Sequence, residues 1–159
     1  MKCASLSTAL FLFASAALAQ ETPFAQQPYR PGASNETMVL SLGDLMGIAQ
    51  WRHLKLWQAG KAENWKLVAF EADKLKESLY RAALLYVNIP TGLIKAADAP
   101  LTTIGEAAAA GNAKAFATGF AKLTEACNTC HVAGGIGFVR MRTPTASPFS
   151  NQDFTPVDR

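Results

Sequence analysis

NWKLVAFEADKLKESLYRAALLY, residues 64–86, carries the clearest helical pattern of the 159-residue chain. Its apolar residues recur at alternating three- and four-residue spacing, which places them on one face of a helix: Trp65, Val68, Ala72, Leu75, Leu79, Ala82 and Tyr86. Asn64 is a suitable N-cap, and Glu77 and Arg81 form a favourable i,i+4 pair on the solvated side. Such a seam is typical of a helix in a bundle.

A first helix is predicted before this one. It starts near Asn35 or at Ser41, where Ser41-Leu42-Gly43-Asp44 resembles a capping box, and it ends at Gly60. Its apolar face comprises Leu42, Leu45, Met46, Ala49, His53, Leu56 and Trp57.

Two more helices are predicted after residues 64–86. A short Ala-rich helix covers Leu101 to Ala110, and a last helix starts after the cap Asn112 and closes at Gly134-Gly135. No stretch shows sustained strand alternation. The sequence therefore predicts an all-α four-helix bundle.

The last predicted helix carries Cys127-Asn128-Thr129-Cys130-His131. Positions i, i+3 and i+4 share one face of a helix, so the two thiols and the imidazole point the same way. C-x-x-C-H is the attachment signature of a c-type haem, in which the thiols add to the vinyl groups and the imidazole binds iron. We expect one haem c, bound covalently through Cys127 and Cys130, with His131 as the proximal ligand.

Two other kinds of site contain a C-x-x-C pair. A thioredoxin-like redox pair needs a βαβ context, which the sequence does not show. A tetrahedral zinc site needs four ligands. Haem attachment is therefore the preferred interpretation.

The N-terminus reads as a secretory signal peptide over residues 1–19. Lys2 precedes an apolar stretch, and Ala17-Leu18-Ala19 forms an A-x-A cleavage site. Cleavage would remove Cys3 and leave two cysteines, both in the haem motif, and would lower the formal charge from +3 to +2. We expect a periplasmic protein with no membrane span and no nucleic-acid partner.

The rest of the chain divides into three parts. Residues 20–35 are rich in proline and read as an extended leader, residues 36–133 as the haem-binding bundle, and residues 134–159 as a Pro-rich tail. We expect the tail to lie over the bundle, with Pro144 to Phe149 covering the haem region.

The motif and the helix order together resemble the cytochrome c-prime and cytochrome c-556 family. The resemblance covers roughly Glu36 to His131 and rests on the signal peptide, the Ala-rich helix, the Gly111-Asn112 break and the motif on the last helix. It implies a bundle around one haem whose distal face is covered by the middle of the first helix. Family members usually stop soon after the motif, whereas this chain continues through its tail.

The sixth iron ligand has few candidates after signal cleavage. The resemblance implies Met46 on the distal side, although a methionine there also suits a core. His53, seven residues on and about 10.5 Å further along the helix axis, is the runner-up. Its alternative role is a histidine near a helix C-terminus that interacts with the helix dipole or a propionate. Met38 and Met141 are less favoured.

Two functions remain open. The first is an electron carrier that cycles between Fe(III) and Fe(II) and serves redox partner proteins in the periplasm. The second is a five-coordinate haem protein that binds NO or CO. An enzyme is not expected, because only His53 could serve as an imidazole acid or base and nothing else converges with it. A homodimer is left open.

Overall fold

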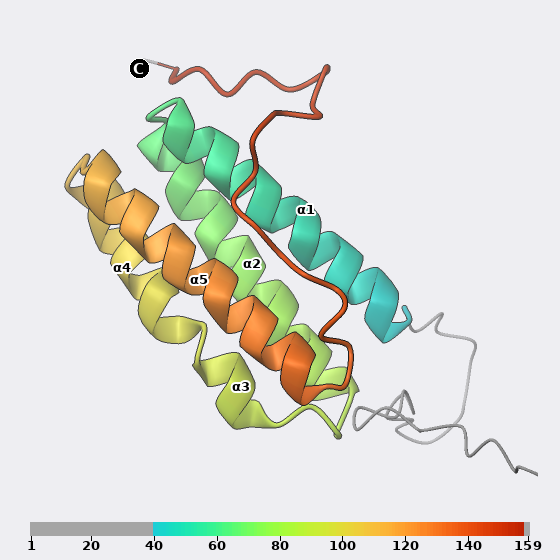
Figure 1. Cartoon of the computed structure of the whole chain (residues 1–159). Coiled ribbons are helices and arrows are strands. Elements are labelled where there is room, and N and C mark those ends of the chain that lie inside the picture. Colours follow the sequence, from blue (N-terminus) through green and yellow to red (C-terminus); the bar gives the residue numbers. More distant parts are fainter. Residues whose placement is uncertain (1–39, 158–159) are drawn as a thin grey trace, which may run out of the picture.

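The computed structural model describes residues 40–157, and within that range the chain is helical with no strand (Figure 1). Four long helices form a bundle: α1 (Leu42–Lys61), α2 (Trp65–Leu85), α4 (Asp98–Ala109) and α5 (Ala113–Ala133). A five-residue helix, α3 (Thr91–Lys95), lies at one end of the bundle. The all-α four-helix prediction is confirmed, whereas the signal peptide and the leader lie outside the described residues.

Local capping explains where three of these helices begin. Ser41 caps α1 in a complete capping box with Asp44, which selects the later of the two predicted starts. Asn64 accepts a hydrogen bond from the Leu67 amide at the start of α2, and Asn112 accepts one from the Ala115 amide at the start of α5. All three predicted caps are confirmed.

The region between α2 and α5 differs from the prediction. Helix α3 was not predicted. Helix α4 begins at Asp98 rather than Leu101, because Pro100 falls in its first turn, where a missing amide proton costs nothing.

The core follows the predicted apolar faces. On α2 and its C-cap, five of the predicted apolar residues are buried: Val68, Ala72, Leu75, Ala82 and Tyr86. On α1, the buried members of the predicted face are Leu42, Leu45, Ala49, His53 and Leu56. These two helices pack along their lengths, and α5 packs mainly on α4.

Helices α1 and α5 contact each other from the Gly60 end of α1 to the middle of α5, where His53 meets Thr124. Gly60 faces the Phe116 ring so tightly that a Cβ atom on Gly60 would overlap it. Trp57 stacks on the same ring with a centroid distance of 5.9 Å. Beyond the contact of His53 with Thr124, toward the motif, residues of both helices line a cavity instead.

Substitution of Gly60 tests this close approach. Gly60→Ala should destabilise the protein by roughly 1–3 kcal/mol, because the added methyl group overpacks the Phe116 site. Gly105→Ala is the matched control: its Cβ meets no heavy atom within 4 Å, so it should stabilise α4 by roughly 0.5–1 kcal/mol. Urea unfolding measures both changes, and a stabilised Gly60→Ala would contradict the packing described.

The tail folds back along the bundle and runs between α1 and α5 in the view of Figure 1. Gln58 donates a hydrogen bond to the Ala146 carbonyl, and Asn64 donates to the Phe154 carbonyl. Phe149 packs on Trp51 with ring centroids 5.3 Å apart. The predicted position over the bundle is confirmed for residues 134–157.

Within residues 40–157, none of the helices combines the length and the apolar character that crossing a membrane requires.

Candidate functional site

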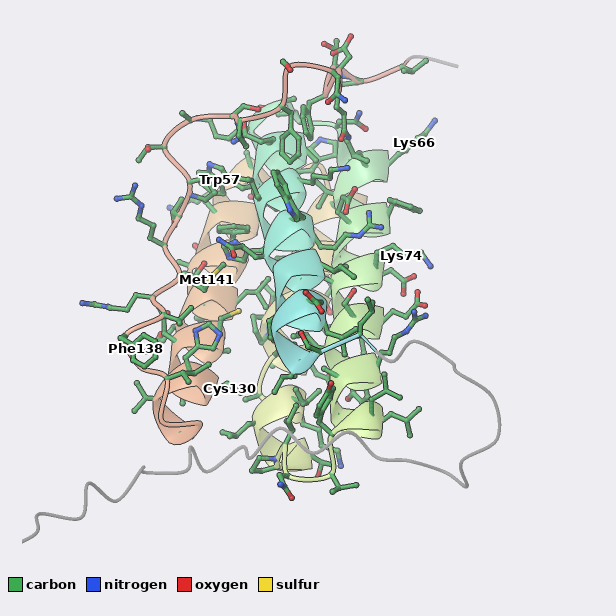
Figure 2. All side chains as sticks on the ribbon, turned by 90° about the vertical axis from the view of Figure 1, so that its right-hand side faces the viewer. Trp57, Lys66, Lys74, Cys130, Phe138 and Met141 are labelled. Carbon is green, nitrogen blue, oxygen red and sulfur yellow. The ribbon has the colours of Figure 1, made fainter. Side chains whose placement is uncertain are left out.

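A cavity of about 290 Å³ lies between α1, α2, α3, the C-terminal half of α5 and residues 136–141. Cys127, Cys130 and His131 all line it, which confirms that the motif residues share one face. Most of the remaining lining is apolar, including Leu75, Leu79, Ile89, Leu93, Ile94 and Ile136. In Figure 2, Cys130 and Phe138 lie near one end of the bundle and Trp57 lies above them, nearer the other end.

The two thiols of the motif are held in their neutral form. Burial raises the pKa of Cys127 to about 11, with a smaller contribution from Cys130, and burial also raises the pKa of Cys130. Redox-active C-x-x-C pairs instead have a lowered thiol pKa. The electrostatics of this site therefore do not resemble those of a thioredoxin-like pair.

The His131 imidazole is fixed by the tail. Its Nδ1 lies 2.7 Å from the Val139 carbonyl oxygen. A carbonyl can only accept, so Nδ1 carries the proton, and in the neutral ring the lone pair is on Nε2. Histidines that bind metal commonly donate their other ring N–H to a carbonyl in this way.

A glycine turn brings the tail to that position. Gly134 caps α5 and Gly135 has φ +71°, a left-handed conformation that favours glycine. The Ile136 amide donates to the His131 carbonyl and the Gly135 amide donates to the Val132 carbonyl, which together form a Schellman motif. The predicted helix stop is confirmed, and it reverses the chain across the cavity.

The segment at the cavity is not the one expected from the sequence. Ile136, Val139 and Met141 line the cavity, whereas Phe149 packs on Trp51. Pro144 to Phe149, which we expected over the haem region, therefore do not line the cavity at the motif. The reversal at Gly135 brings the earlier part of the tail back over the motif instead.

Three candidates for the sixth ligand line the same cavity: Met46, His53 and Met141. The sequence favours Met141 less because it lies in the tail, where no periodicity or motif marks it. Met38, the fourth candidate, lies outside the described residues. In addition to the His131 imidazole, the structure thus brings two thioethers and a second imidazole to the cavity.

His53 is a neutral interior histidine. It is only 2% exposed, and its Nε2 lies 2.9 Å from Thr124 Oγ1. The Thr124 hydroxyl donates its proton to the Phe120 carbonyl, so its oxygen accepts from His53 Nε2–H. Burial lowers the pKa of His53 to about 4. The interpretation of His53 as a cation that interacts with the helix dipole is therefore wrong.

The lowered pKa of His53 predicts acid sensitivity. The unfolded chain binds a proton at its ordinary pKa of 6.5 and the folded protein only near 4, so stability falls as the pH drops between these values. This group alone should cost roughly 2 kcal/mol between pH 7 and pH 5. Thermal melting of wild type and His53→Leu measures it: the variant should lose less stability over that range. Equal losses in both proteins would contradict the assignment.

Known protein families, curated proteins and solved structures give no match to this chain. In the part of the chain that the structure describes, no three His, Cys, Asp or Glu side chains are grouped to hold a metal ion by themselves.

Proposed function

We propose that the chain is a monohaem c-type cytochrome that transfers single electrons. The observation that supports this most is the shared placement of Cys127, Cys130 and His131 in one largely apolar cavity. The Nδ1 bond of His131 adds to it, because it leaves Nε2 as the nitrogen with a lone pair for iron. A bound haem would supply the Fe(III)/Fe(II) couple.

Each part of the site has a role in this proposal. Cys127 and Cys130 would hold the porphyrin through thioether bonds, and His131 would bind its iron. The apolar lining from α1, α2 and α3 would exclude water, which is one of the means by which a protein sets a haem potential. Met46 of α1 is our preferred sixth ligand, with His53 as runner-up.

The structure gives one reason to keep the gas-binding alternative. His53 Nε2 already donates to Thr124, so a six-coordinate iron would rely mainly on the thioethers of Met46 and Met141. Without such a bond the iron would be five-coordinate and open to NO or CO.

We further propose that the mature protein works in the periplasm with redox partner proteins. This rests on the predicted signal peptide and on the chemistry of c-type haem. Val132 and Phe138, which both follow the motif, are 68% and 81% exposed and offer apolar surface to a partner.

Absorption spectra test the proposal and separate its two forms. We expect a low-spin ferric spectrum and a ferrous spectrum that changes little when CO is added. A high-spin ferric spectrum with rapid CO binding would favour the gas-binding function. A purified protein without haem absorption would overturn both.

A further inference from the structure

Asn128, the first variable residue of the C-x-x-C-H motif, binds the tail through both atoms of its amide. The Met141 amide donates to Asn128 Oδ1 at 2.7 Å, and Asn128 Nδ2 donates to the Met141 carbonyl at 3.0 Å. One side chain therefore satisfies both backbone groups of a residue thirteen positions away. The motif residue and the tail are clamped together.

This clamp lies next to the histidine contact. Val139, whose carbonyl oxygen accepts from His131, is only two residues before Met141. Several hydrogen bonds hold the chain from the glycine turn to Met141. The Ile136 amide donates to the His131 carbonyl, and the Val139 carbonyl accepts from His131 Nδ1. Both backbone groups of Met141 bond to Asn128. The glycine turn fixes one end of this segment, and Asn128 fixes the other. The Val139 carbonyl is held between these two points.

We propose that Asn128 is a positioning residue for the iron ligand: by clamping Met141, it holds the Val139 carbonyl against Nδ1 of His131. This inference rests on the proposed function. A hydrogen bond from Nδ1–H to a carbonyl makes the imidazole a stronger donor to a metal, and a stronger donor stabilises Fe(III). The tail therefore affects how strongly His131 donates to iron, as well as covering the cavity. The same clamp places the Met141 side chain in the cavity lining.

The side-chain chemistry makes the clamp specific to asparagine. An aspartate keeps the acceptor for the Met141 amide but has no donor for its carbonyl, and an alanine has neither. Thr129, the other variable residue of the motif, is exposed, and its hydroxyl bonds only to the Glu125 carbonyl of the same helix. Thr129→Ala is therefore a matched control within the motif.

The test uses the full chain with its haem attached. The exchange rate of the His131 Nδ1 proton with solvent is measured by NMR in the ferrous protein, with CO added where the ferrous iron is high-spin. In Asn128→Ala we expect exchange roughly tenfold or more faster, because two hydrogen bonds that hold the segment are lost. We also expect a higher midpoint potential. Asn128→Asp should be intermediate, and Thr129→Ala should match wild type.

Several outcomes would overturn the inference. Wild-type exchange and potential in Asn128→Ala would show that the clamp does not position His131, and an equal acceleration in Thr129→Ala would show a general loosening of α5. If Asn128→Ala accumulates without haem, Asn128→Asp decides: faster exchange than wild type supports the inference and an unchanged rate overturns it. Failure of the proposed function is seen separately, as a wild-type protein that carries no covalent haem.

Discussion

Replacement of both Cys127 and Cys130 by alanine is expected to abolish covalent haem and to remove most of the helical signal. The cavity that these residues line has a volume of about 290 Å³. At about 24 cal/mol per Å³ of cavity, leaving it unfilled would cost up to roughly 7 kcal/mol, which is comparable with the whole stability of a small domain. Because the haem would fill this cavity only in the folded protein, the free energy of haem binding contributes directly to the stability of the fold.

Circular dichroism and thermal melting check this expectation. The single variant Cys127→Ala is the matched control, because it can keep one thioether bond and the filled cavity. A double variant that lacks haem but keeps native circular dichroism and a sharp melting transition would contradict the account.

The second large effect concerns the sixth ligand. Met46→Ala should convert a low-spin spectrum to a high-spin one and speed CO binding, because removal of a thioether opens the iron. His53→Leu should leave the iron unchanged, since His53 Nε2 is already bonded to Thr124. Absorption spectra and CO-binding rates measure both variants.

Met141 requires a third variant in that series, because it lines the same cavity. If Met141→Ala alone produces the high-spin spectrum, the ligand comes from the tail and Met46 is the wrong choice. A change in His53→Leu alone would point to the imidazole instead. A wild type that is already high-spin would favour the gas-binding function over electron transfer.

The helices that the sequence predicted well are those whose signals are local. The caps Ser41, Asn64 and Asn112 act on amides three residues away, so residue type and spacing are enough to find them. Helix α3 is too short to show a period, and α4 begins before the predicted Leu101 because the first turn of a helix tolerates Pro100.

At the site, too, the features that the sequence predicted are those with signals between residues close in sequence. Cys127, Cys130 and His131 were predicted together because i, i+3 and i+4 positions share a helix face. The contact between His131 and Val139 was not, because its acceptor is a backbone carbonyl that any residue type could supply. The bond of His53 to Thr124 spans 71 positions, and only the packing of α1 against α5 brings the two together.

Denaturing mass spectrometry of the purified protein, together with extraction by acidified organic solvent, tests the central claim most directly. Expression in a host that attaches haem to secreted chains should give a mature protein whose mass exceeds that of the chain by one haem. That haem should stay with the protein after extraction, because thioether bonds at Cys127 and Cys130 survive unfolding. A chain with two unmodified thiols, or a haem that extraction removes, would contradict the assignment.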